Sequence, residues 1–78
     1  MYYTYILQMN NKTYYSGFTD DLKRRVKEHS EGKVHTTSIN LPIKLVWYGC
    51  FMDKKKASDF EKYLKSSSGF SFRNKRLL

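Results

Sequence analysis

The chain has 78 residues, with 15 Lys and Arg against 7 Asp and Glu, which gives a formal net charge of +8. Folding hides only about 60% of the surface of so short a chain. This length predicts a single domain over residues 1–78 with a thin core, and it excludes a large cofactor cleft. No apolar run approaches the roughly 20 residues that span a bilayer, and the N-terminal residues lack the basic start and cleavage site of a signal peptide. Because Cys50 is the only cysteine, an internal disulfide is excluded and a structural zinc site is disfavoured, so we expect a cytoplasmic protein.

Aromatic and β-branched residues at the N-terminus predict a β-hairpin. Residues 3–7 have the composition of a strand, residues 9–12 read as a turn because Asn tolerates left-handed backbone, and residues 13–18 return as a second strand. The loop length decides where two tyrosines lie. An odd number of loop residues puts Tyr5 and Tyr15 directly opposite each other on one face, and an even number puts them on opposite faces.

A helix is predicted next, because residues 19–21 supply a polar cap and first-turn acids. Gly32 is suited to end this helix as a left-handed cap. The helical spacing i, i+3, i+4, i+7 defines the stripe that faces the sheet. This stripe contains Leu22, Arg25, Val26 and His29.

The remaining chain predicts a polar connection over residues 33–41, a third strand over 43–51 and a second helix over 54–65 that Asp53 caps. Residues 66–69 break this helix, and residues 70–78 form a short basic helix or an extended tail. The sum is an α+β fold, a small three-stranded, mostly antiparallel sheet flanked by helices. The stripe of the second helix contains Ala57, Phe60, Glu61 and Leu64.

Charged residues lie on both of these stripes. Arg25 stands between Leu22 and Val26, and Glu61 stands beside Phe60. Long ionised groups seldom face a thin core unless they are paired or bind something. They are either boundary residues whose heads reach water, a structural salt bridge across the sheet, or parts of a site. A cation, a carboxylate and several tyrosine hydroxyls on one sheet face suit phosphodiester cleavage.

His29 lies one helical turn beyond Arg25, where a structural and a catalytic role are both open. We assign no role to His35. The tyrosines of the hairpin are ordinary strand-filling aromatics unless this site exists. The charge of +8 favours a polyanionic partner, nucleic acid first and an anionic membrane surface second, over a basic surface that only aids solubility.

Taken together, these segments resemble the GIY-YIG nuclease superfamily, specifically its short bacterial stand-alone members. Tyr3-Thr4-Tyr5 stands where the family has Gly-Ile-Tyr, and Tyr15-Ser16-Gly17 stands where it has Tyr-Ile-Gly. Arg25 and His29 fall at the family's Arg-x-x-x-His, and Glu61 falls at its metal-binding glutamate. The order and spacing of these pieces are more specific than any one of them.

Tyr3 and Asn74 fall at the first and the last motif of the family, and these two motifs match less closely than the others. Tyr3 replaces the first glycine of the motif, which narrows access near Tyr5. Asn74 is a candidate for the late polar residue of the family's final motif. Residues 68–70 and 75–77 also resemble the tail of the stand-alone group.

The resemblance implies a divalent-metal-dependent endonuclease that hydrolyses phosphodiester bonds in DNA and leaves a 5′-phosphate and a 3′-hydroxyl. Glu61 would hold one Mg²⁺ or Mn²⁺ ion, and one carboxylate with several waters is how Mg²⁺ often binds. Tyr5 or Tyr15 would act as general base or orient the attacking water, Arg25 would neutralise phosphate charge, and His29 would assist proton transfer or positioning.

Three points stay open at this stage. A tyrosine near pKa 10 is a poor base at neutral pH, so a nearby cation would have to lower that value. A non-catalytic nucleic-acid-binding module with the same fold is the main alternative to the nuclease, and a small basic protein–protein adaptor is a third. The uncovered edge strands also allow a homodimer.

Overall fold

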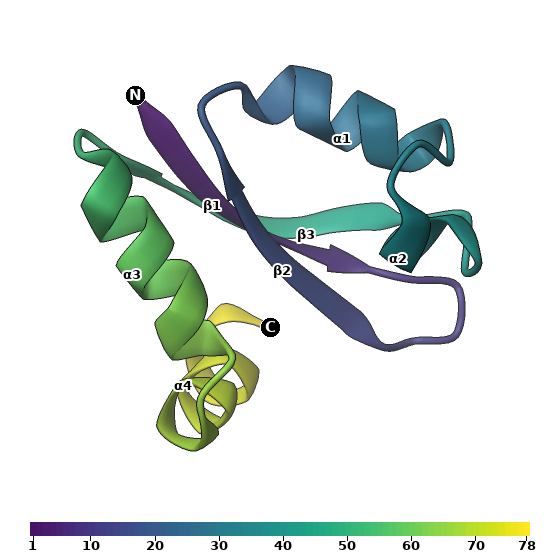
Figure 1. Cartoon of the computed structure of the whole chain (residues 1–78). Helices are drawn as coiled ribbons and strands as arrows, with labels where there is room; N and C mark the ends of the chain where they lie inside the picture. Colours follow the sequence, from purple (N-terminus) through teal and green to yellow (C-terminus); the bar gives the residue numbers. More distant parts are fainter.

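The computed structural model describes residues 1–78 and has the predicted α+β architecture, a three-stranded sheet flanked by helices (Figure 1). All three predicted strands and both predicted helices are confirmed within two residues at either end. None of the helices combines the length and the apolar character needed to cross a membrane. The elements in chain order are β1 (Tyr2–Gln8), β2 (Tyr14–Thr19), α1 (Leu22–Ser30), α2 (His35–Ser38), β3 (Lys44–Phe51), α3 (Lys54–Leu64), α4 (Ser67–Phe72) and the π-helical turn η1 (Arg73–Leu77).

The sheet has the strand order β2-β1-β3, and both pairs are antiparallel. Successive side chains of a strand point to opposite faces. Tyr5 of the central strand β1 therefore faces α1, where it contacts His29, whereas Thr4 faces α3 and its hydroxyl donates to the carbonyl oxygen of Ala57 at 2.7 Å. Since β1 is central, β2 and β3 are both free edges.

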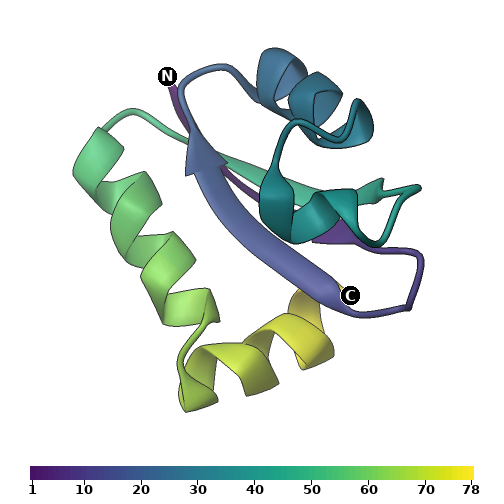
Figure 2. The ribbon, with the colours of Figure 1, turned by 45° about the vertical axis from the view of Figure 1, so that its right-hand side comes forward.

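Each main helix begins at a capping aspartate. Asp21 accepts the backbone N–H of Arg24 at 3.0 Å, and Asp53 accepts that of Lys55 at 2.7 Å. Such caps satisfy N–H groups that have no partner within the helix. The helix α3 buries Ala57, Glu61 and Leu64, as its predicted stripe requires. Figure 2 shows β2 in front, with α3 on one side of it and α1 and α2 on the other.

The hairpin register differs in detail from the prediction. The loop comprises residues 9–13, an odd number, so Tyr5 and Tyr15 do share one face, but they are not directly opposite. Tyr5 pairs with Gly17 instead. The loop is longer than expected because Lys12 adopts a left-handed φ of 73°, and the Asn11 side chain accepts the N–H of Thr13 at 3.1 Å.

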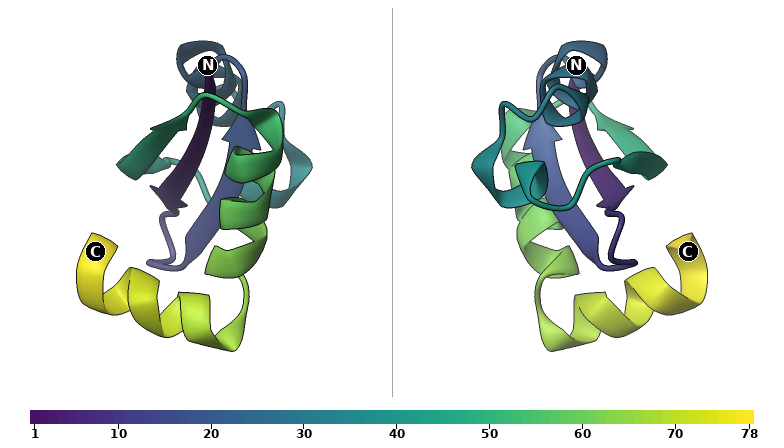
Figure 3. Two further views of the ribbon diagram at one scale, coloured as in Figure 1. Left: turned by 90° about the vertical axis from the view of Figure 1, so that its left-hand side faces the viewer. Right: turned by 90° about the vertical axis from the view of Figure 1, so that its right-hand side faces the viewer.

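Two helices begin where the sequence predicted no helix. The connection over residues 33–41 contains α2, which buries Thr37 completely. The serines after α3 do end that helix, but they also start α4, because the Ser66 hydroxyl accepts the N–H of Gly69 at 3.1 Å. The chain beyond is helical rather than extended, and Figure 3 shows it crossing beneath the end of the sheet that carries the hairpin loop.

Candidate active site

A buried chain of hydrogen bonds links β1, α1 and α2. The Tyr5 hydroxyl lies 2.9 Å from His29 Nε2, and His29 Nδ1 lies 2.8 Å from Thr37 Oγ1. The Thr37 hydroxyl donates its single proton to the Val34 carbonyl oxygen at 3.3 Å, so it accepts from Nδ1–H. Nε2 then carries the lone pair and accepts the proton of the Tyr5 hydroxyl. This assignment of tautomer follows from the network of donors and acceptors.

Burial sets the protonation states of the Tyr5 phenol and the His29 imidazole. It raises the pKa of Tyr5 to about 12, with smaller contributions in the same direction from Tyr15 and Glu61. The Arg25 guanidinium lowers the pKa of Tyr5, but burial outweighs it, so the lowered pKa that a tyrosine base would need is not found at Tyr5. Burial, helped by Arg25, lowers the pKa of His29 to about 4. At neutral pH the phenol and the imidazole are therefore both uncharged.

Gly17 makes room for the phenol at the edge of the sheet. A Cβ atom at this position would lie 2.5 Å from the Tyr5 hydroxyl oxygen and 2.7 Å from the ring carbon that bears it. No side chain fits there without moving Tyr5. Glycine at this position thus lets the phenol of the central strand reach across β2.

Tyr15 stands beside this phenol on the same face. Its ring packs edge-on against His29, with the ring centroids 5.1 Å apart, and the Tyr5 ring packs on the same imidazole at 5.7 Å. His29 thus contacts both tyrosines of the predicted site.

Arg25 lies at the rim of the site and is half-buried. Its guanidinium pairs with Glu28 at 3.1 Å, and the two side chains are 34% and 33% exposed. A cavity of about 410 Å³ opens beside it, lined mostly by polar residues of α1 and β2 and by the first residue of α3. The predicted alternative of a salt bridge between Arg25 and Glu61 is wrong, because each has a partner one turn away on its own helix.

Glu61 is 8% exposed and lies on the face of α3 that packs on the sheet. Its carboxylate forms an ion pair with the ammonium group of Lys65, a side chain that is 58% exposed. No group of three His, Cys, Asp or Glu side chains comes together in the chain. Mg²⁺ usually binds to one or two carboxylates and completes its coordination sphere with waters and phosphate oxygens. The single carboxylate of Glu61, which already pairs with the Lys65 ammonium group, fits this preference.

The edge strand β2 lies between the two helical layers that carry Arg25, His29 and Glu61 (Figure 2). Tyr5, Tyr15 and His29 are in contact, and Arg25 and Glu61 both act electrostatically on Tyr5. The prediction that all these groups share one sheet face is wrong. Tyr5, His29 and Arg25 lie on the α1 side of the sheet, whereas Glu61 lies on the α3 side, because successive residues of β1 point to opposite faces and the two helices pack on opposite faces.

The comparison with known families agrees with this geometry. The family model of the GIY-YIG catalytic domain matches residues 1–76. The chain belongs to the GIY-YIG family. Members of this family are typically nucleases, and those nucleases generally use divalent metal ions.

Relatives of this GIY-YIG chain are short bacterial proteins. It is 40% identical over 65 residues to a UPF0213 protein of Lacticaseibacillus paracasei, an alignment that covers 82% of this chain and 73% of the relative. A UPF0213 protein of Bacillus licheniformis is 35% identical over 86% of this chain and 70% of its own length. The solution NMR structure of a UPF0213 protein from Bacillus halodurans superimposes with a TM-score of 0.60 at 30% identity, covering 99% of this chain and 87% of that one.

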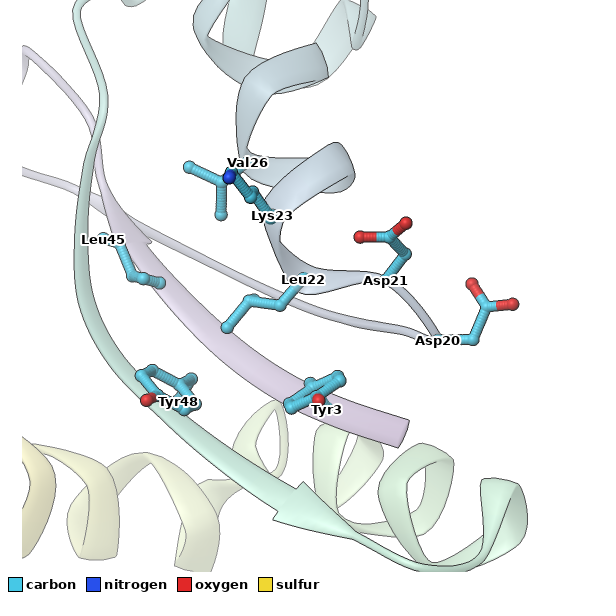
Figure 4. A pocket seen from close by; sticks show the side chains of 8 residues that line it. All are labelled: Tyr3, Asp20, Asp21, Leu22, Lys23, Val26, Leu45 and Tyr48. Carbon is cyan, nitrogen blue, oxygen red and sulfur yellow. The ribbon is translucent and has the colours of Figure 1, made fainter. Parts of the chain in front are cut away.

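The largest cavity of this GIY-YIG domain contains none of the five predicted site residues. It has a volume of about 550 Å³ and lies between α1 and the strands β1 and β3, where Leu22 points towards Tyr3 and Tyr48 (Figure 4). It shares only Asp20 with the cavity beside Arg25. Its lining is mainly apolar, so it offers few groups for acid–base or phosphate chemistry.

Three residues that shape the site were missed in the sequence. Glu28 and Lys65 follow Arg25 and Glu61 at helical spacings of three and four residues, so the ordinary rule for pairs along a helix could have found them. Thr37 offered no such signal. It lies in a polar connection, and only the folded chain shows that it fixes the tautomer of His29.

Proposed function

We propose that this GIY-YIG domain is a divalent-metal-dependent endonuclease that hydrolyses phosphodiester bonds in DNA. The observation that supports this best is the buried chain from Tyr5 through His29 to Thr37, together with the electrostatic action of both Arg25 and Glu61 on the Tyr5 phenol. Polar networks are costly to bury unless every member is satisfied. A small core that keeps such a network next to a cation and a carboxylate favours a chemical role over a packing role.

The reaction breaks the bond between phosphorus and the 3′ oxygen. The oxygen of a water molecule attacks phosphorus, the leaving oxygen takes up a proton to become a 3′-hydroxyl, and the phosphate remains on the 5′ side. Arg25 binds the scissile phosphate, because a guanidinium matches the geometry of two phosphate oxygens. To do so, its guanidinium turns away from Glu28. The ion pair between Arg25 and Glu28 is partly exposed, so it contributes only weakly to stability.

Tyr5 orients the attacking water. Its hydroxyl proton points to His29 Nε2, so the lone pairs of its oxygen are free to accept a hydrogen bond from the water. With a pKa of about 12 the phenol is neutral. If it takes the proton of the water, it passes its own proton to Nε2 in the same step, and His29 becomes the charged group. Tyr15 remains the alternative base, since it contacts the same imidazole.

Glu61 is the residue that would hold the metal ion, with Lys65 displaced from its carboxylate. A bound Mg²⁺ or Mn²⁺ ion stabilises the negative charge that develops on the phosphate. Lys65 can move away at little cost, because its ammonium group is largely in water.

A non-catalytic nucleic-acid-binding module is the second candidate. One observation favours it, namely that Arg25 and Glu61 each have a salt-bridge partner on their own helix and therefore have a structural use without any substrate. This module would use the same basic surface and the same fold.

Cleavage assays separate the two candidates. The protein is incubated with labelled single-stranded, duplex, flap and branched DNA in Mg²⁺, in Mn²⁺ or in EDTA, and the ends of any product are analysed. The nuclease predicts metal-dependent products with a 5′-phosphate on at least one substrate. Binding to these DNAs without product in any metal would establish the non-catalytic module instead.

A further inference from the structure

Arg73 is a buried charge. Its residue is only 8% exposed, and its guanidinium lies between two aromatic rings, 4.9 Å from the ring centre of Tyr14 and 4.5 Å from that of Phe70. Two of its N–H groups donate to Asn74 Oδ1, at 3.2 and 3.1 Å. Both interactions involve uncharged partners. An ionised group is costly to bury unless a counter-charge accompanies it.

None of the 7 Asp and Glu residues of the chain supplies this counter-charge. Each is already engaged, and the C-terminal carboxylate makes no ion pair with Arg73 either. Two cap helices, Asp21 and Asp53, and the others pair with basic residues close by in sequence, namely Asp20 with Arg24, Glu28 with Arg25, Glu31 with Lys33, Asp59 with Lys55 and Glu61 with Lys65.

Arg73 lines a cavity of about 370 Å³. Besides Arg73 the lining consists of Thr13, Tyr14, Phe70 and Asn74. The Tyr14 hydroxyl oxygen accepts from Gln8 at 3.5 Å and keeps its own proton to donate. Phe70 is 52% exposed, so its ring offers free surface. The site therefore combines unused donors for an anion with an aromatic ring on which a base can stack.

The position of this cavity relates it to the proposed active site. Tyr14 lies on the edge strand β2, three residues before Gly17, where the Tyr5 hydroxyl is found. Three residues of a strand span about 10 Å. This distance corresponds to about three nucleotides at the roughly 3.4 Å rise per nucleotide of duplex DNA. A nucleic acid strand that follows the β2 edge would meet both places.

We propose that Arg73, with Asn74 and Phe70, binds a backbone phosphate of a nucleic acid strand a few nucleotides from the bond that is cut. The flanking base stacks on Phe70. The ligand class rests on the proposed function, but the binding itself requires neither metal nor cleavage. The rival account is a purely structural one, in which Arg73 only holds η1 against the hairpin by stacking on the two rings.

The wild-type protein labelled with ¹⁵N tests this directly. In EDTA, the Nε–H signal of Arg73 is followed by NMR during titration with a short single-stranded DNA and, separately, with inorganic phosphate. We expect a saturable shift of this signal with the DNA. An unchanged Arg73 signal while other signals shift would overturn the proposal, and so would saturation by inorganic phosphate without any shift by DNA, which would indicate a small-anion site.

The salt dependence of DNA binding gives an independent measurement, again in EDTA. Arg73→Met keeps much of the apolar volume and removes one charge, and Lys33→Met removes one charge from an exposed residue that lines none of the cavities. The slope of log K against log salt should fall by about 0.7 to 0.9 in Arg73→Met and stay unchanged in Lys33→Met. Equal slopes in the wild type and Arg73→Met would overturn the proposal. If DNA binds as expected but is never cut, the nuclease fails and this site stands.

Discussion

The Tyr5 hydroxyl donates its proton to Nε2 of His29 across 2.9 Å, and neither residue is more than 1% exposed. This contact joins the central strand to the first helix and leaves the lone pairs of the phenol for another donor. Removing either partner leaves the other without its buried hydrogen bond, which costs about 1–3 kcal/mol. The effects of the two residues on stability and on catalysis are therefore linked.

Removing only the hydroxyl of Tyr5 separates its chemistry from its packing. We expect Tyr5→Phe to slow single-turnover DNA cleavage by about 100-fold or more, because the attacking water loses its orienting oxygen. Tyr15→Phe is the matched variant on the same sheet face. If Tyr15→Phe loses more activity than Tyr5→Phe, then Tyr15 is the residue that handles the water.

The low pKa of His29 makes the stability of the protein fall in acid. Between its ordinary value of 6.5 and about 4, the unfolded chain takes up a proton that the native state does not. The free energy of unfolding should therefore decrease as the pH falls from 6.5 to 4, by about 3 kcal/mol in total. Above pH 6.5 His29 makes no contribution to this dependence.

Urea unfolding at a series of pH values measures this effect. His29→Gln should flatten the dependence between pH 4 and 6.5, whereas His35→Gln, at the exposed histidine, should leave it as in the wild type. An NMR titration of the His29 ring with a midpoint near 6.5 in the folded protein would contradict the assignment.

Replacement of Gly17 is predicted to reduce activity more than it reduces stability. In Gly17→Ala the new methyl group would overlap the Tyr5 hydroxyl, which lies 2.5 Å from its position, so the phenol must leave His29. Such overpacking destabilises by about 1–3 kcal/mol. Gly32→Ala is the control, since it strains a left-handed φ of +76° at a position where the added methyl group would approach Leu41 and Ser38 rather than Tyr5. Activity per folded molecule should fall in Gly17→Ala only, and equal losses in both would show that stability alone is responsible.

Lys65 is expected to compete with the metal ion for Glu61. Lys65→Met removes the ammonium group from the carboxylate, and we expect Mn²⁺ to bind a few-fold more tightly, as measured by calorimetry. Lys62→Met, at an exposed residue of the same helix, removes the same charge without touching Glu61 and is the control. Unchanged or weaker Mn²⁺ affinity in Lys65→Met relative to this control would count against Glu61 as the metal ligand.

Much of the fold could be predicted from local patterns. The aromatic and β-branched composition of the strands and the Asp caps before both main helices located β1, β2, β3, α1 and α3. The helix α2 was missed because its four residues are polar, and its one buried side chain, Thr37, is held by a contact with His29. The start of α4 was missed because serine both ends a helix and caps the next one.

The site could be predicted only in part, for a physical reason. Helical spacing placed Arg25 and Glu61 on inward stripes, and both act electrostatically on Tyr5, Arg25 from α1 and Glu61 from α3. Spacing alone could not show that Arg25 pairs with Glu28, or that burial outweighs Arg25 in setting the pKa of Tyr5. These outcomes depend on distances between elements, which the periodicity of one element does not contain.

The most direct test of the nuclease is the single-turnover rate of DNA cleavage in Mg²⁺ by Glu61→Gln and by Glu31→Gln. Both remove one carboxylate charge, and Glu31 is an acid outside the site that pairs with Lys33. We predict a loss of about 100-fold or more in Glu61→Gln, corresponding to about 2.7 kcal/mol of transition-state stabilisation, and a rate within a factor of about 2 of the wild type in Glu31→Gln. Wild-type cleavage with equal rates in both variants would contradict the role of Glu61, and no cleavage by the wild type in any metal would contradict the nuclease itself.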